Sequence, residues 1–259
     1  MKSTSRTLLF LLLAALPFTL FSQGRTIIAA YMKVPGNYND YLEIEQAWKK
    51  YHQKAVEAGV HNGWQLWMNR HAGQDDPYQF ITLQWYDNYE HALGENIHEG
   101  WLEGTYTDEE WEELYDKTLD ARVYAIEEVS NLISMAENPT QTRYLVVSRV
   151  DAKPGMEEDY ENMEKDIFKP YHEELIRRGN LSHWGVWNIW PYREGQHRYV
   201  IVNGYATAKD LNTPKPWIEP ADLGIEYTVD EITKLVQTTR EDQSNIEVWE
   251  LLDAVFPGE

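Results

Sequence analysis

The chain has 259 residues, a formal net charge of −20 and no cysteine. An acidic surface repels phosphate backbones, so nucleic acid is not an expected partner, and the absence of cysteine excludes disulfides and thiolate metal sites. Eleven Trp and 17 Tyr are more than a core of this size needs, which suggests that some of them line a cavity.

Residues 1–24 have the pattern of a secretory signal peptide. Lys2 and Arg6 precede an apolar run over 8–21, and small or polar residues follow up to the expected cleavage point near Gln23 or Gly24. An uncleaved membrane anchor is the weaker alternative, because the apolar run is short for a bilayer span. We therefore expect a secreted or periplasmic protein with no stable membrane insertion after cleavage.

The remaining chain repeats itself at a distance of about 120 positions. The Pro-Gly turn at 35–36 returns at 154–155, Tyr51-His52 returns as Tyr171-His172, and the segment 64–67 (WQLW) returns as 184–187 (WGVW). This duplication predicts a first unit over 25–136, a linker over 137–142 and a second unit over 143–259, and therefore a pseudo-dimer within one chain.

Each half shows the same order of predicted elements. In the first half, hydrophobic periodicity and turn residues predict strands at 26–34, 62–69, 78–87 and 123–129, and helices at 40–58 and 108–121. In the second half they predict strands at 144–150, 181–190, 198–205 and 246–252, and helices at 157–178 and 229–239. Pro170 and about one extra residue between Glu164 and Tyr171 predict a kink or a break in the longer helix.

A β-α-β-β-α-β unit forms a four-stranded antiparallel sheet with both helices on one face. Tryptophans three residues apart in a strand, such as Trp64 and Trp67, point to opposite faces, so both faces of the sheet must be buried. The helices cover one face, and the sheet of the other half is the expected cover for the second face.

This pattern resembles the dimeric α/β-barrel superfamily, which includes antibiotic-biosynthesis monooxygenase-like and NIPSNAP-like proteins. The resemblance covers both halves and includes a short helical turn after the third strand, at 88–92 and 207–211. It implies an α+β fold in which two tandem ferredoxin-like units pair their antiparallel sheets into a pseudo-dimeric α/β barrel. It also implies a ligand or a haem between sheet and helices.

His52 and His172 are the candidate catalytic residues, because each follows a tyrosine at the same place on the first helix of its half. A histidine on a helix can act as a proton shuttle or as an axial haem ligand. The alternative, which duplication alone would also produce, is that both rings pack at the helix edge. The cofactor is left unknown, since haem is allowed but not required by the sequence.

Aromatic and polar strand residues are the candidate ligand contacts. Tryptophans can stack on a flat ligand or simply fill the barrel, and polar groups such as Gln84, Asn203 and Arg149 can orient a ligand or pair with one another across the barrel. The candidate ligand-binding residues are Trp67, Gln84, Tyr86, Arg149, Trp187, Asn203 and Tyr205.

These features predict a protein that binds a small apolar or aromatic molecule between sheet and helices. A monooxygenase-like or haem-dependent oxidoreductase is the alternative, and a purely structural role would follow from a fully packed interior. Zinc-protease, phosphate-loop and nucleophile-elbow signatures are absent from the sequence, and no metal site is predicted.

Overall fold

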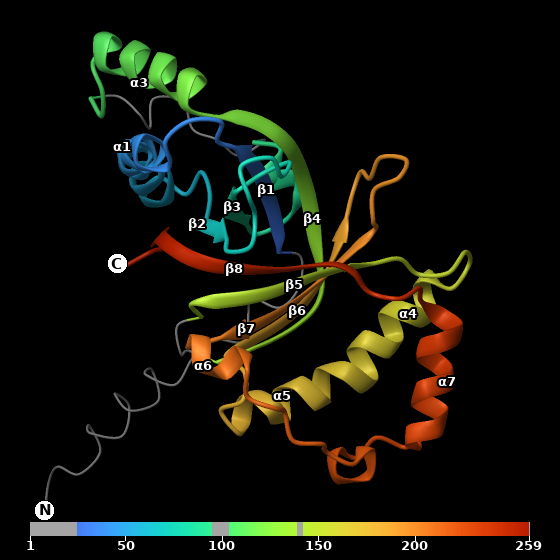
Figure 1. Ribbon diagram of the computed structural model, residues 1–259. Helices are drawn as coiled ribbons and strands as arrows, with labels where there is room; N and C mark the ends of the chain where they lie inside the picture. The colour runs from blue at the N-terminus through green and yellow to red at the C-terminus, as the bar shows by residue number, and fades with distance from the viewer. Residues whose placement is uncertain (1–24, 95–103, 139–141, 259) are drawn as a thin grey trace, which may run out of the picture.

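The computed structural model describes residues 25–94, 104–138 and 142–258. In this part of the chain, eight strands form a closed antiparallel barrel with helices on its outside (Figure 1). The strands are Thr26–Lys33 (β1), Gly63–Asn69 (β2), Phe80–Tyr86 (β3), Val123–Glu137 (β4), Tyr144–Val150 (β5), His183–Ile189 (β6), Tyr199–Tyr205 (β7) and Ser244–Val255 (β8). The helices are Tyr38–Glu57 (α1), Tyr89–Ala92 (α2), Asp108–Ala121 (α3), Glu157–Met163 (α4), Lys169–Arg177 (α5), Ala208–Leu211 (α6) and Val229–Thr239 (α7), with a 3₁₀ turn at Pro220–Leu223.

The strand order confirms the duplication and the predicted barrel. Around the barrel the order is β4-β1-β3-β2 for the first half and β8-β5-β7-β6 for the second, which is the same order twice. The halves join where β2 pairs with β8 and β4 pairs with β6. The two sheets therefore face each other across the interior and also hydrogen-bond along both edges.

Strand β4 is longer than the predicted 123–129, and this prediction was wrong at its C-terminal end. Residues up to Asn131 pair with β1, and from Ser130 onward the strand pairs with β6 of the other half. The additional residues are stabilised by a long-range partner, which local periodicity does not reveal. The strand ends at Glu137, within the expected linker, and residues 139–141 lie outside the described residues, as does the expected leader at 1–24.

The first helix of each half packs on the outer face of its sheet, and the two helices differ in regularity. Helix α1 is continuous, whereas its counterpart consists of α4, a π-helical segment over Glu164–Phe168 and α5. A π-helical turn accommodates one extra residue without turning the rest of the helix off its packing face. The predicted interruption is therefore present as this π-helical segment, and Pro170 lies in the first turn of α5 directly after it.

Outward and inward side chains alternate as predicted from the paired tryptophans. Trp64 lies in the core beneath α1 and Trp184 in the core beneath α4 and α5. Trp67 and Trp187, three residues further along, lie in the core inside the barrel. Both faces of each sheet are buried, one by helices and one by the opposite sheet.

A buried ion pair connects the first helix of each half to the end of its last helix. Glu45 of α1 pairs with Arg122 at the C-terminus of α3, and Glu164 pairs with Arg240 at the C-terminus of α7, with Nη1 3.6 Å from Oε1. Both carboxylates are almost completely buried. Sequence reasoning did not single out these residues, although the glutamates occupy matching positions in the repeat.

None of the helices in the described part of the chain has both the length and the apolar character of a bilayer span.

Candidate functional site: a cavity inside the barrel

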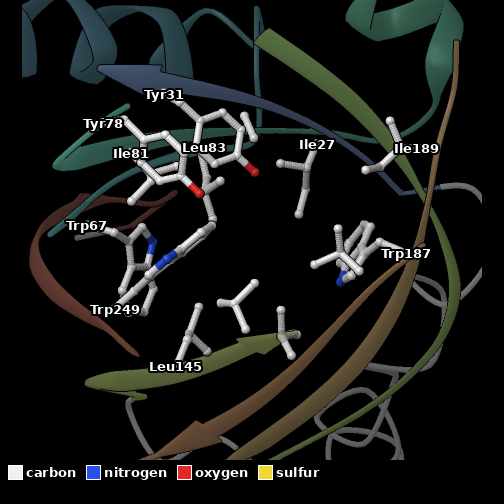
Figure 2. Close-up of a cluster of buried hydrophobic side chains, with 14 residues drawn as sticks. Ile27, Tyr31, Trp67, Tyr78, Ile81, Leu83, Leu145, Trp187, Ile189 and Trp249 are labelled. Atoms are coloured by element: carbon white, nitrogen blue, oxygen red, sulfur yellow. The ribbon is translucent and has the colours of Figure 1, made fainter. Parts of the chain in front are cut away.

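The barrel interior contains a cavity of about 510 Å³ lined by both halves of the chain. Figure 2 shows side chains from both sheets pointing into this space, with Tyr31, Trp67 and Trp249 on one side and Trp187 on the opposite side. The lining is mostly apolar and includes Ile27, Ala29, Leu83, Leu145, Val200 and Val202. The interior is therefore not fully packed, in contrast to what a purely structural barrel would require.

A buried polar network lies inside the barrel beside the cavity and reaches its wall through Tyr31. Arg149 on β5 donates from Nη1 to Glu128 Oε1 and Oε2 at 3.0 and 3.1 Å, and from Nη2 to the Tyr31 hydroxyl at 2.8 Å. Gln196, from the β6–β7 hairpin, donates to Glu128 at 2.6 Å. Burial alone would lower the pKa of Arg149, but Tyr31 and Glu128 raise it above its usual value, so the guanidinium stays charged.

One end of the cavity is its mouth, because lining residues there are partly exposed. Arg25 and Glu137 form an ion pair across it, with 3.6 Å between Nη2 and Oε1. His183, at the start of β6, also lines the mouth. Burial and the nearby Arg25 charge lower the pKa of His183 to about 4, so the imidazole is neutral at physiological pH.

Four indole rings line the cavity, and three of them donate their N–H group within the protein. Gln65 Oε1 accepts from Trp67 Nε1 at 3.3 Å and from Trp85 Nε1 at 3.1 Å. Trp249 Nε1 donates to Glu247 at 2.6 Å. For Trp187, no acceptor is found in the described part of the chain, although its side chain is only 3% exposed. The Trp85 and Trp187 rings meet in a T-shaped arrangement, with 5.7 Å between centroids.

Solved structures share this architecture. A protein of Lactobacillus acidophilus NCFM, provisionally named a monooxygenase, superposes with a TM-score of 0.56 at 9% identity, over 91% of this chain and 98% of that chain. An anthrone oxidase-like protein matches at 0.50 and 10% identity, over 91% and 94% of the two chains. A provisionally named monooxygenase of Fusobacterium nucleatum subsp. nucleatum ATCC 25586 matches at 0.50 and 11%, over 91% and 96%. The chain has the dimeric α/β-barrel fold. At these identities the likeness establishes that fold alone, and no family sequence model and no curated protein matches the chain.

In this dimeric α/β barrel, the two candidate catalytic histidines lie outside the cavity. The His52 ring stacks on Trp64 with 4.7 Å between centroids, and the His172 ring stacks on Trp184 at 4.6 Å. Both tryptophans are on the helix-facing side of the sheet. His52 Nδ1 lies 3.2 Å from His61 Nε2, and His172 Nδ1 donates to the carbonyl of Phe168 at 2.7 Å. These contacts agree with the packing alternative considered for the two residues.

The positions of these two histidines also bear on whether they could ligate a haem in the barrel cavity. The sheet separates both histidines from the barrel cavity, so neither can ligate an iron held there. Each ring lies flat against an indole between helix and sheet. His52 and His172 therefore do not fit the role of axial ligands to a haem held in the barrel cavity.

The candidate ligand-binding residues are divided between the two faces of the sheet. Trp67, Trp187 and Arg149 are inside the barrel, and the first two line the cavity. Gln84 and Tyr86 are on the outer face of β3, where the Tyr86 hydroxyl donates to Gln84 at 2.8 Å. Asn203 and Tyr205 occupy the matching positions of β7, with Tyr205 against the core beneath α4 and α5. Arg149 thus pairs with Glu128 and Tyr31, and not with Gln84 or Asn203 across the barrel.

Sequence reasoning missed His183 and Trp249 in the wall of this cavity and Glu128 in the polar network beside it. Trp85 and Leu83 alternate with Gln84 in β3, so a consistent assignment of faces from Trp67 would have placed them inside the barrel. Glu128 gave no such signal, because its inward position follows from the register of β4 against β1.

Proposed function

We propose that the protein binds a small, largely apolar molecule with an aromatic ring inside the barrel. The observation that carries this proposal is the cavity of about 510 Å³ with four indole rings in its wall. Small-molecule sites typically have volumes of ~300–1,000 Å³ and apolar walls with few polar groups. The proposal differs from the sequence prediction in location, since the cavity is between the two sheets and not between a sheet and its helices.

Binding to naphthalene derivatives, measured by isothermal titration calorimetry and by thermal shift, tests the proposal. Occupation of the cavity should raise the melting temperature with ligand concentration, because the ligand binds only the folded state. Tryptophan fluorescence should change at the same time, since four indoles surround the ligand. A panel of apolar aromatic compounds that produces no heat, no stabilisation and no fluorescence change would contradict the proposal.

We also propose that the protein acts after export, in the periplasm or outside the cell. The signal-peptide pattern of residues 1–24 supports this, and strand β1 begins at Thr26, directly after the expected cleavage point. Cell fractionation and N-terminal sequencing of the natural product are the test. A full-length chain retained in the cytoplasm would be the contrary result.

Oxidation of the bound molecule is a second candidate function. The dimeric α/β barrels that match this chain include an anthrone oxidase-like protein and two provisionally named monooxygenases. The walled aromatic cavity also supports it, because an enclosed site protects reactive intermediates from water. Oxygen uptake measured with anthrone as substrate distinguishes the two candidates: uptake above a heat-denatured control indicates oxidation, and none indicates binding alone.

A further inference from the structure

One difference between the two halves of the barrel concerns an equivalent pair of positions on the inner face of the sheets. Gln65 in β2 and Gly185 in β6 each precede a cavity tryptophan by two residues, Trp67 and Trp187 respectively. In the first half, Gln65 Oε1 accepts the indole N–H groups of Trp67 and Trp85. In the second half, glycine supplies no acceptor, and Trp187 is left without one in the described part of the chain.

Gly185 also brings a second nitrogen close to the indole of Trp187. A Cβ atom on Gly185 would lie 3.1 Å from Trp187 Nε1 and 3.3 Å from His183 Nε2, so both nitrogens approach the same point. No hydrogen bond joins these two side chains, and none connects the imidazole of His183 to another residue in the described part of the chain. Both side chains line the cavity. Two polar groups at a mostly apolar wall thus share one location and lack protein partners, which is how a site for a ligand atom is expected to look.

We propose that Trp187 and His183 recognise one hydroxyl group on the aromatic ligand, whose oxygen takes the place that Gln65 Oε1 has in the other half. This assignment rests on the proposed function and names the chemical class of the ligand as a phenol or similar hydroxylated aromatic. The indole N–H can only donate, so it requires an acceptor oxygen. The imidazole, when neutral, can accept a hydrogen bond from the hydroxyl group at its unprotonated nitrogen. A hydroxyl group satisfies both partners at once.

Three probes with the same ring system separate the parts of this recognition. 2-Naphthol can accept and donate, 2-methoxynaphthalene can only accept, and 2-methylnaphthalene can do neither. Calorimetry on the wild-type protein should show 2-naphthol binding about five- to tenfold more tightly than 2-methylnaphthalene, the effect of one or two net hydrogen bonds. 2-Methoxynaphthalene should bind with an intermediate affinity.

Substitutions assign the preference to the two side chains. Trp187→Phe and His183→Phe should each reduce the preference for 2-naphthol to about twofold or less while 2-methylnaphthalene still binds. Trp184→Phe is the matched control, because this tryptophan is on the outer face of the same strand. It should leave the preference of the wild type unchanged.

The possible outcomes separate this assignment from the proposed function. Equal binding of the three probes to the wild-type protein, or a preference that persists in both Phe variants, overturns the assignment and leaves the binding function in place. No binding of any probe overturns both. The order of the three affinities requires no variant, so the assignment is tested even where a substitution disturbs folding.

Discussion

The guanidinium of Arg149 and the carboxylate of Glu128 form a buried ion pair between the two halves of the chain, with Nη1 3.0 and 3.1 Å from the carboxylate oxygens. Glu128 belongs to the last strand of the first half, and Arg149 to the first strand of the second half. Both groups are hydrogen-bonded to Tyr31, which lines the barrel cavity. It also requires the two sheets to adopt one relative register, because a shifted register would leave a buried charge without a partner.

We expect Glu128→Gln to lower the free energy of unfolding by about 3–5 kcal/mol, since it leaves the buried Arg149 charge uncompensated. The double variant Glu128→Leu with Arg149→Met should recover most of this loss. Urea denaturation provides the measurement. Lys117→Ala, which removes an exposed helix pair with Glu113, is the control and should change stability by less than about 0.5 kcal/mol. A loss below about 1 kcal/mol for Glu128→Gln would contradict the importance of the buried pair.

His172 should make the stability of the protein fall in mild acid. Burial lowers its pKa to about 4, whereas in the unfolded chain it is about 6.5. Between these values the unfolded chain binds a proton that the folded protein does not, so stability decreases as the pH falls from about 6.5 to 4 by up to about 1.4 kcal/mol per pH unit. His172→Phe keeps an aromatic ring on Trp184 and should flatten the curve of melting temperature against pH. The exposed His71→Asn is the control, and a curve for His172→Phe as steep as that of the wild type would refute the argument.

Glu164 should have the opposite pH dependence. Burial raises its pKa to about 7, although Arg240 opposes the shift. A raised pKa in the folded state gives a contribution to stability that is complete below the unfolded pKa of about 4.5 and is lost as the pH rises through 7. We therefore expect the difference in stability between Glu164→Gln and the wild type to shift in favour of the variant by about 2 kcal/mol as the pH rises from 5 to 8, on top of the pH-independent cost of removing the partner of Arg240. Glu158→Gln, at an exposed position of α4, should show no such gain in the same denaturation series.

Two neighbouring alanines in β1 point to opposite faces of the sheet, one to the cavity and one to the core beneath the helices. Ala29 lines the cavity, and Ala30 packs in the core beneath α1. Ala29→Phe should fill part of the cavity and weaken probe binding more than about tenfold with little loss of stability. Ala30→Phe should lower stability by about 1–3 kcal/mol through overpacking, while probe binding remains. Calorimetry and thermal unfolding on both variants are the measurements, and unchanged binding to Ala29→Phe would place the ligand elsewhere.

Sequence alone predicted most of the fold, because the folding unit is repeated in the chain and its strands and helices are visible in short sequence patterns. The repeated Trp64 and Trp184 segments carry the strands and the burial of both sheet faces, and the extra residue before Tyr171 accounts for the interrupted helix. The length of β4 could not be predicted in the same way, since its second part depends on pairing with β6. Periodicity describes a strand but not its distant partner.

The location of the site was harder to predict than the fold. Tryptophans on both faces of β2 and β6 do not reveal which face points to the helices, so Gln84 and Asn203 were grouped with Arg149, from which the sheet separates them. The cavity is also a property of the closed barrel. Its volume depends on how the interior side chains from both sheets fill the space between them, and no local sequence pattern encodes that sum.

Carrying both units on one polypeptide has a consequence for how such a barrel can evolve. In a symmetric homodimer, a substitution that creates a hydrogen-bonding position on one wall creates it on the opposite wall as well. Here Gln65 and Gly185 are encoded by separate codons, so one wall can keep its structural hydrogen bonds while the other changes. The covalent fusion therefore permits an asymmetric interior, in which a bound molecule can have a single preferred orientation.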